Sequence, residues 1–449
     1  MLLIVRGIIW YGLYLFLILL PLITAAISNP TRAAQPFLVE VAVAAGFIGF
    51  SIMSLEFALI SRINAAAQPF GEDSLQLFHN IMGTTALGFV LAHPILLIIS
   101  GYPANCWLNP FASCANISTI TAFLSIVVLL LLIITSIWRK RLGIRYEVWY
   151  VLHGLFALFV IFVALVHIFL IGRYTSTLEM KIVWGIYAVL VLGLIGWFKI
   201  FLPIRNWNQR WELVENRVER GDARTLVFKP DAHDGFNFKP GQFSWIKSGR
   251  TPFGLGQHPI SMSSAGDVEP GGTVSFTIKN LGDWSGQVVP KMQPGERAWL
   301  FGPHGVFSMD REQAMGYVFI GGGVGITPLR SMLHTMVKRE DNRPVILFYG
   351  ANSYAEMTFR EEFEELARAN QLNFTFVPVL SAPEEEWTGE TGFISVDIMQ
   401  RNMASYEKQY KFFKYLICGP KPLMDAMEEA LPALGIPPEN VLTERFDMV

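Results

Sequence analysis

Two apolar stretches decide the fold of this chain: LFHNIMGTTALGFVLAHP at residues 77–94 and YVLHGLFALFVIFVALVH at residues 150–167. Neither stretch contains a charged residue, and each carries two histidines that lie fourteen positions apart. On an α-helix, fourteen residues correspond to a rise of about 21 Å and to nearly four turns, so both histidines share one helix face at two depths. The repeated spacing predicts two helices that face each other with matched histidines.

The four histidines are His79, His93, His153 and His167. An unpaired histidine is costly in lipid, and imidazole is a common axial ligand of haem iron. The matched spacing therefore predicts two b-type haems, each held by two histidines, rather than four isolated polar side chains. Because histidine fills both axial positions, such a haem would relay electrons instead of binding oxygen at iron.

Composition indicates a membrane protein. The chain has 449 residues, of which 52% are hydrophobic and only 16% are charged, too apolar for an ordinary soluble protein. The apolar residues concentrate in the first 202 positions, and the remainder is long enough for two further domains. The net charge of −2 gives no indication of a nucleic-acid partner.

Six stretches are long enough to cross a lipid bilayer. They are residues 7–27, 37–59, 75–100, 117–138, 147–171 and 182–202. The first could instead be a signal peptide, because Arg6 precedes it and LITAAIS resembles a cleavage region, but its apolar run is too long for one. We therefore expect an all-α bundle of six transmembrane helices.

Basic residues predict the orientation of the bundle. Nine fall on one side, Arg6, Arg62, Arg139, Lys140, Arg141, Arg145, Lys199, Arg205 and Arg210, and three on the other, Arg32, Arg173 and Lys181. The positive-inside rule then puts the N-terminus and the soluble half in the cytoplasm of a cell with the bundle in its inner membrane. The third and fifth stretches run in the same direction, so His79 should face His153 near the cytoplasmic side and His93 should face His167 near the outer side.

Other polar residues of the bundle have two interpretations each. Arg145 and Arg173 lie at the ends of the histidine ladder and could bind haem propionates or anchor helix ends at the interface. Glu56 could lie on a proton path, but a pair with Arg62, or a side chain that snorkels to the interface, is the simpler interpretation.

Three cysteines occur in the chain. Cys106 and Cys114 belong to an outer loop and could form a disulfide, which the sequence alone does not decide. Their spacing speaks against zinc and iron–sulfur sites.

Beyond about residue 211 the pattern changes to short alternating runs separated by Gly and Pro turns. The runs are ELVENRVE, RTLVFKP, QFSWIKS, TVSFTIKN and RAWLFGP, which predict a small antiparallel β-barrel. From about residue 315, strands alternate with helices, and YVFIGGGVGITPLRSMLHTMV has the strand, glycine turn and helix of a doubly wound α/β nucleotide domain. The expected domains are residues 1–205, 206–310 and 311–449.

The motifs of the soluble half resemble those of the ferredoxin-NADP reductase superfamily. They are HPIS at 258–261, GDWS at 282–285, GGGVGITP at 321–328 and CGP at 418–420. Together with the histidine spacing, their order makes residues 40–449 similar to the ferric reductase and NADPH oxidase family, which joins a haem-bearing six-helix domain to FAD and NAD(P)H domains. Residue 260 departs from the family, which usually has Phe there.

The resemblance implies roles for individual residues of the barrel. His258, Pro259 and Ile260 would lie along the flavin, and Ser261 would approach its reactive nitrogen. Backbone donors of Gly282, Asp283, Trp284 and Ser285 would bracket the FAD pyrophosphate. Phe446 would cover the flavin ring.

In the nucleotide domain, glycines let the backbone approach a second pyrophosphate. They are Gly321, Gly322, Gly323 and Gly325, followed by Ile326 in the place of a third motif glycine and by Thr327 at the helix start. The resemblance places Cys418, with Gly419 and Pro420, beside the nicotinamide, although a buried structural thiol would give the same sequence.

The choice of nicotinamide is predicted from charge. After the strand VILFYG there is no acidic residue to bind a ribose hydroxyl until Glu356. Ser353 and Arg360 could instead bind a 2′-phosphate, with Arg330 as a further candidate, although either arginine could simply be a solvated helix residue. The pattern favours NADPH over NADH.

The function implied by the resemblance is electron transfer from cytoplasmic NAD(P)H through FAD and two haems to an acceptor outside, either oxygen or a ferric chelate. The chain has no regulatory extension of the kind some members carry, so we expect ungated activity. Two alternatives stay open: supply of electrons to a periplasmic redox protein, and a haem-free membrane anchor for a cytoplasmic NAD(P)H:flavin reductase.

Overall fold

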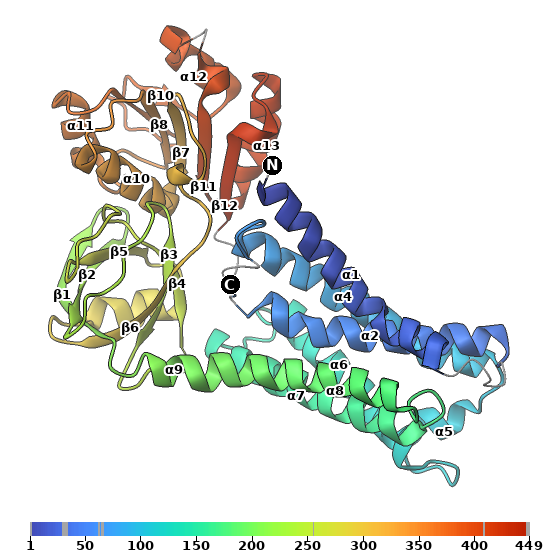
Figure 1. The fold of residues 1–449 in the computed structure, drawn as a ribbon. Coiled ribbons are helices and arrows are strands. Elements are labelled where there is room, and N and C mark those ends of the chain that lie inside the picture. The colour runs from blue at the N-terminus through green and yellow to red at the C-terminus, as the bar shows by residue number, and fades with distance from the viewer. Residues whose placement is uncertain are drawn as a thin grey trace. The chain divides into compact units, whose positions relative to one another are not determined.

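The computed structural model describes residues 2–28, 35–61, 63, 67–254, 256–406 and 409–445. The chain divides into two compact units, Met1–Pro203 and Ile204–Val449, each with its own hydrophobic core (Figure 1). The units are described separately below.

The first unit is helical. Its helices are α1 (Leu2–Ser28), α2 (Phe37–Leu59), α4 (Glu72–Ile99), the short α5 (Ala104–Leu108), α6 (Ile117–Ile137), α7 (Tyr146–Ile171) and α8 (Leu178–Gly196), which continues through a π-helical turn into α9 (Leu202–Arg205). Six of these segments are long and apolar enough to cross a membrane, as predicted. Cys106 of α5 forms a disulfide with Cys114 in the loop that follows.

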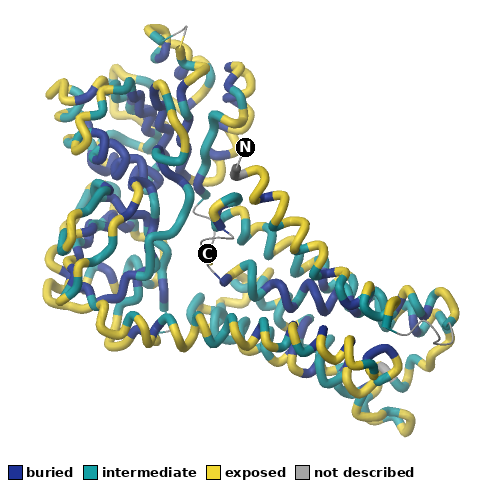
Figure 2. The backbone as a smooth tube through the Cα atoms, in the orientation of Figure 1, coloured by how far each residue is buried: buried dark blue, intermediate teal, exposed yellow. Residues whose placement is uncertain are grey.

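Helix α2 is the most enclosed of the six spans, and Figure 2 shows its dark, buried stretch inside the bundle. Small residues allow this burial: a β-carbon at Gly49 would lie 2.8 Å from Cγ2 of Val90 on α4. Phe50 of α2 also packs edge-to-face on the fully buried Trp184 of α8. Helix α2 therefore packs closely against α4 and fixes its position.

The second unit begins with an antiparallel barrel. Its strands are β1 (Arg210–Glu219), β2 (Ala223–Asp231), β3 (Phe243–Ser248), β4 (His258–Ser261), β5 (Val274–Lys279) and β6 (Arg297–His304), in the order β4-β3-β6-β1-β2-β5. A bridge between Met262, directly after β4, and Phe276 of β5 joins the two ends of the sheet. Alternating side chains of the strands fill the interior of the barrel, as the alternating pattern in the sequence predicts.

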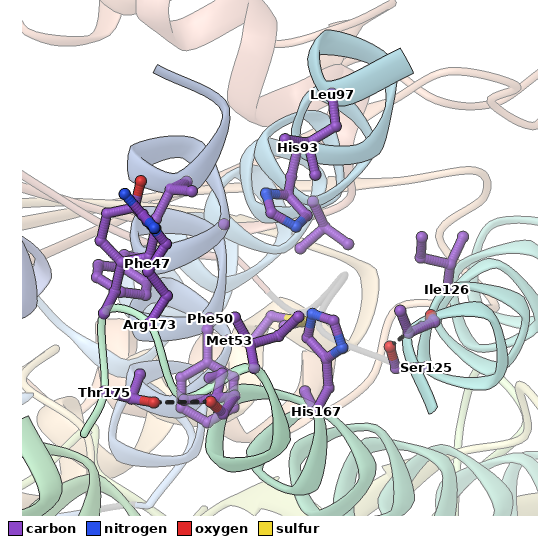
Figure 3. Close-up of a pocket in the computed structure, with 18 of the residues that line it drawn as sticks. Phe47, Phe50, Met53, His93, Leu97, Ser125, Ile126, His167, Arg173 and Thr175 are labelled. Atoms are coloured by element: carbon purple, nitrogen blue, oxygen red, sulfur yellow. Dashed lines mark hydrogen bonds between the residues drawn. The ribbon is translucent and has the colours of Figure 1, made fainter. Parts of the chain in front are cut away.

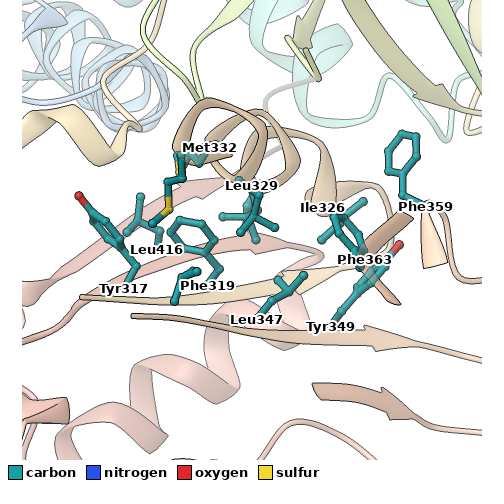
Figure 4. Packing of buried hydrophobic residues seen from close by; sticks show 14 of the residues in the cluster. Tyr317, Phe319, Ile326, Leu329, Met332, Leu347, Tyr349, Phe359, Phe363 and Leu416 are labelled. Atoms are coloured by element: carbon teal, nitrogen blue, oxygen red, sulfur yellow. The ribbon is translucent and has the colours of Figure 1, made fainter. Parts of the chain in front are cut away.

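The unit continues with a six-stranded parallel sheet in the order β10-β9-β8-β7-β11-β12. The strands are β7 (Tyr317–Gly322), β8 (Val345–Ala351), β9 (Phe374–Leu380), β10 (Glu390–Thr391), β11 (Lys414–Gly419) and β12 (Val441–Arg445). Helices α10 (Ile326–Lys338) and α11 (Arg360–Arg368) contribute to the core on one face, seen in Figure 4, and α12 (Val396–Asn402) and α13 (Lys421–Ala433) to the core on the other. The predicted fold class is therefore confirmed: a helical membrane-type bundle, an antiparallel FAD-domain-type barrel and an α/β nucleotide-type domain.

Candidate functional site

The histidines of α4 and α7 lie opposite each other in two pairs. The ring centres of His79 and His153 are 6.3 Å apart, and those of His93 and His167 are 6.4 Å apart. Figure 3 shows His93 and His167 pointing toward each other from separate helices. Equal separations at two depths follow from the shared fourteen-residue spacing on two helices that run in the same direction.

Hydrogen bonds fix which ring nitrogen faces away from the partner helix. Nδ1 of His93 lies 2.7 Å from the carbonyl oxygen of Ala42, and Nδ1 of His167 lies 2.9 Å from that of Ser118. A carbonyl oxygen can only accept, so Nδ1 carries the proton in both rings. The other nitrogen, Nε2, is then the unprotonated one and is suited to bind a metal.

The second pair reaches the same tautomer by different partners. The Ser136 hydroxyl donates to the Leu132 carbonyl over 2.6 Å and accepts from Trp149 over 3.3 Å, so His153 Nδ1, 3.0 Å away, is best assigned as a second donor to it. Nδ1 of His79 contacts the carboxylate of Glu56. Glu56, for which a pair with Arg62 was expected, thus has its contact on α4; Arg62 lies outside the described residues.

Glycine on α2 makes the His93 contact feasible. A β-carbon at Gly46 would lie 3.0 Å from His93 Nδ1 and 3.2 Å from its Cγ. Any side chain there would push the ring away from the Ala42 carbonyl. Sequence reasoning missed Ala42, Gly46, Ser118 and Ser136, because only the helix packing brings them to the histidines.

A cavity of about 210 Å³ separates His93 from His167. Its walls are mainly apolar and come from α2, α4, α6 and α7, with Phe47, Phe50 and Leu129 among them. Arg173, one of the two arginines considered for haem propionates, lines this cavity. Arg145 is a largely exposed side chain whose Nε lies 4.0 Å from the Glu147 carboxylate.

In the barrel, Ser261 ends β4 and is 3% exposed. Its hydroxyl has no hydrogen-bond partner among the residues that the structure describes, which is unusual for a buried polar atom. His258, at the start of the same strand, stacks on Trp284 with ring centres 3.9 Å apart and planes 12° apart. Pro259 and Ile260 lie between His258 and Ser261 in β4, and both pair with residues of β3.

The GDWS segment is partly closed on itself. The Ser285 hydroxyl accepts hydrogen bonds from the amides of Leu281 and Gly282, over 3.0 and 2.9 Å. The Gly282 amide therefore serves the loop in this structure, whereas Asp283 and Trp284 begin a short π-helical turn.

The glycine turn lies at the point where the strand order reverses, between β7 and β11, which is where open α/β sheets bind ligands. A β-carbon at Gly325 would lie only 2.2 Å from the Cys418 carbonyl oxygen, and one at Gly322 would lie 2.9 Å from Cδ of Pro420. The turn and the CGP segment therefore touch through their backbones. Gly321 and Gly419 pack in the same crowded region, and Gly323 has a positive φ of 54°.

Helix α10 starts at Ile326, and the Thr327 hydroxyl donates to the Val324 carbonyl over 3.0 Å. Cys418 is fully buried and lies in register with Gly321 on β7 and with Glu444 on β12. Glu444, itself 5% exposed, was missed by sequence reasoning, because an acid in a short strand is ordinarily a surface residue. The cysteine and the buried carboxylate thus lie side by side at the sheet's switch point.

The residues proposed for nicotinamide selection are already engaged. Arg360 donates to the Tyr354 carbonyl over 2.9 Å, lies over the Tyr354 ring and pairs with the exposed Glu361. Ser353 accepts from the Glu356 amide over 3.3 Å. Phe446 lies outside the described residues.

Arg330 has a different role from the one considered. Its guanidinium forms a bidentate pair with Glu362, both bonds 2.7 Å, and donates to the Ser263 carbonyl of the barrel over 2.7 Å. His334 contacts the same carboxylate over 2.6 Å. Buried and bonded in this way, Arg330 connects the sheet domain to the barrel.

Comparisons with known proteins match the helical unit and the soluble unit to different families. Residues 45–164 match the family described as ferric reductase like transmembrane component, and residues 319–429 match the oxidoreductase NAD-binding domain. The chain is 39% identical over 158 residues to one component of the Na(+)-translocating NADH-quinone reductase of Klebsiella pneumoniae, covering 34% of this chain and 38% of that protein. It is 31% identical to the reductase component of propane 2-monooxygenase from Rhodococcus jostii, covering 55% of this chain and 65% of that protein.

Among solved structures, the flavohem-like FAD/NAD binding domain of nitric oxide dioxygenase from Vibrio cholerae is similar over 54% of this chain and 99% of its own, with 23% identity and a TM-score of 0.45. The chain spans about two fifths of the length of several of its curated relatives. The two family matches fall on the histidine helices and on the glycine turn described above. This chain therefore joins a segment that matches a ferric reductase like transmembrane component to a segment that matches an oxidoreductase NAD-binding domain.

Proposed function

We propose that this protein carries electrons from cytoplasmic NAD(P)H through FAD and two b-type haems to a small acceptor, oxygen or ferric iron, on the outer side of the inner membrane. The observation that carries the proposal is the pair of histidine pairs, with ring centres 6.3 and 6.4 Å apart and each Nδ1 turned toward a protein oxygen.

The separation of the rings fits a shared metal. A metal–imidazole bond of about 2.0 Å, added to about 1.1 Å from nitrogen to ring centre, puts two rings on opposite sides of one metal roughly 6.2 Å apart. Among the described residues, no group of three or more His, Cys, Asp or Glu is arranged to hold a metal. Each pair therefore offers two ligands, and a tetrapyrrole would supply the four that an octahedral iron still needs.

The soluble unit supports the reducing half of the reaction. When bound, FAD takes a hydride from nicotinamide and passes on single electrons, which haem iron requires. The unpartnered Ser261 hydroxyl would orient the flavin, the glycine turn would receive the dinucleotide pyrophosphate, and Cys418 would lie at the nicotinamide.

A second candidate function is supply of electrons to a periplasmic redox protein. Two of the relatives are named as parts of larger enzymes, a quinone reductase and a monooxygenase, and so work beside other proteins. Superoxide dismutase separates the two functions: it should abolish NADPH-driven cytochrome c reduction that passes through superoxide, but it should leave direct transfer to a protein unchanged.

The proposal is tested by the reduced-minus-oxidised absorbance spectrum of the purified full-length protein. We expect b-type bands from two haems per chain in the wild type, and bands from the outer centre alone in His153→Leu. Flavin reduction by NAD(P)H should survive in that variant, because the flavin site uses other residues. The control is Asn80→Leu, at an exposed position beside His79. Absence of b-type bands in the wild type would leave only a membrane-anchored flavin reductase.

A further inference from the structure

The four histidines differ in the charge of the oxygen that Nδ1 contacts. His93 and His167 face backbone carbonyls and His153 faces a hydroxyl, all of which are neutral. Among the residues that the structure describes, only His79 of the four contacts a carboxylate, that of Glu56. The two side chains are only 16% and 11% exposed, so the contact is shielded from water.

The position of Glu56 is set by the geometry of α2. Helices α2 and α4 pack against each other in opposite directions, and Ala42 and Glu56 are fourteen residues apart, as are His93 and His79. One helix therefore supplies the acceptor for both α4 histidines, a carbonyl at one depth and a carboxylate at the other. A carbonyl would serve equally well to orient His79, so the carboxylate calls for a further reason.

An anionic acceptor changes the ligand electronically. It draws the Nδ1 proton toward itself, which raises the basicity of Nε2 and favours the more oxidised, more positive state of a bound metal. Hydrogen bonding of this kind and nearby charge are among the means by which proteins set haem potentials. The same carboxylate is about one 21 Å helix rise from the other centre, where its influence is much weaker.

We infer that Glu56 sets the reduction potential of the centre at His79 and His153 below that of the centre at His93 and His167. This inference rests on the proposed function. One electron then leaves the inner centre, which is oxidised, and enters the outer centre, which is reduced, with a favourable free energy and no bond made or broken. Glu56 is a positioning residue: it acts through His79 and does not contact the reacting atoms of substrate.

The test is an anaerobic redox titration of the full-length protein, with the two centres resolved by absorbance and by the ferric electron paramagnetic resonance signals. Glu56→Gln keeps the size and an acceptor oxygen but removes the charge. We expect the reduced-to-oxidised ratio of the low-potential centre, measured at a fixed potential, to rise at least tenfold. This corresponds to an increase of about 59 mV in its reduction potential for one electron. Its resonance signal should shift, while the other component stays unchanged.

Three further variants make the outcome specific. Glu56→Asp retains the charge and should retain the low potential. Ser136→Ala removes a neutral partner from His153 of the same centre and should change the potential less than Glu56→Gln. Glu179→Gln removes an exposed acid at the start of α8 and should change neither centre.

Two haems with unchanged potentials in Glu56→Gln, or an equal shift of both, would overturn the inference and leave the proposed function standing. If Glu56→Gln fails to bind haem, the wild type and Glu56→Asp are compared instead. The inference would be overturned if, in both proteins, the reduction potential of the inner centre is not lower than that of the outer centre. A wild type without haem bands would instead overturn the proposed function itself.

Discussion

A β-carbon at Gly46 would lie 3.0 Å from Nδ1 of His93, closer than about nine in ten such contacts in proteins. The glycine therefore allows the hydrogen bond from His93 to Ala42. We expect Gly46→Val to turn the His93 ring away and to lower bound haem from two to about one per chain, in line with the roughly 10–100-fold loss of metal affinity typical when such partners are disturbed. Pyridine haemochrome analysis of purified protein measures this.

Gly88→Ala on α4 is the control for that prediction, because a β-carbon there meets nothing within 4 Å. Equal haem content in the Gly46 variant and the wild type would mean that the ring does not need the space.

The contact between the glycine turn and the CGP segment gives a second prediction. Gly325→Ala would put a methyl group 2.2 Å from the Cys418 carbonyl oxygen, so β11 and the turn must separate. We expect a loss of about 2–4 kcal/mol in the free energy of unfolding and at least a tenfold loss of NAD(P)H oxidation. Gly350→Ala at the end of β8, where the nearest atom would be 3.6 Å away, should be tolerated, and equal behaviour of the two variants would contradict the argument.

Acid should weaken the link between the sheet domain and the barrel. Burial tends to raise the pKa of Glu362, but hydrogen bonds from His334 and Arg330 outweigh it and hold that pKa at about 2, below its usual 4.5. A carboxyl whose folded pKa is lowered stabilises the fold above its unfolded pKa, and this stability is lost as the pH falls toward the folded pKa.

We therefore expect the wild type to lose about 2 kcal/mol between about pH 5 and pH 2 through this group, allowing for partial screening by solvent. Thermal unfolding across that range checks it. Glu362→Gln should be less stable at pH 7 and should lose less on acidification, whereas Glu364→Gln, on the same helix, should follow the wild type. Parallel pH profiles for wild type and Glu362→Gln would refute the assignment.

Arg360 provides the test of nicotinamide choice. Its guanidinium pairs with Glu361, whose side chain is more than half exposed, and a 2′-phosphate could replace that partner without loss of charge balance. We expect Arg360→Ala to lower the ratio of kcat/KM for NADPH over NADH about tenfold, or about 1.4 kcal/mol. Arg368→Ala, an exposed arginine at the end of α11, is the control. A wild-type preference for NADH would contradict the charge argument, and an unchanged ratio in the variant would remove Arg360 from the site.

Periodic features of the sequence predicted the fold well. The six spans, the barrel strands and the parallel sheet follow from hydrophobic patterns that are local along the chain, and the structure has them within a few residues. Partners of side chains were harder to predict. Glu56 reaches His79 across two helices, and Arg330 reaches Ser263 across two domains, so neither contact leaves a local pattern. The Nδ1 acceptors Ala42 and Ser118 contribute backbone oxygens, which carry no residue signature at all.

The helix that supplies the Nδ1 acceptors comes earlier in the chain than the helix that carries the histidines. Helix α2 orients the two histidines of α4, and α6 orients the two histidines of α7. As the chain is synthesised from its N-terminus, the acceptors are therefore already in the bilayer when the histidines follow. Each hairpin can fix the tautomers of its own two rings without any contact from the other hairpin. What remains for the last stage of biogenesis is the meeting of the two hairpins, each of which carries one histidine of both centres, and two tetrapyrroles inserted between them would complete the two sites.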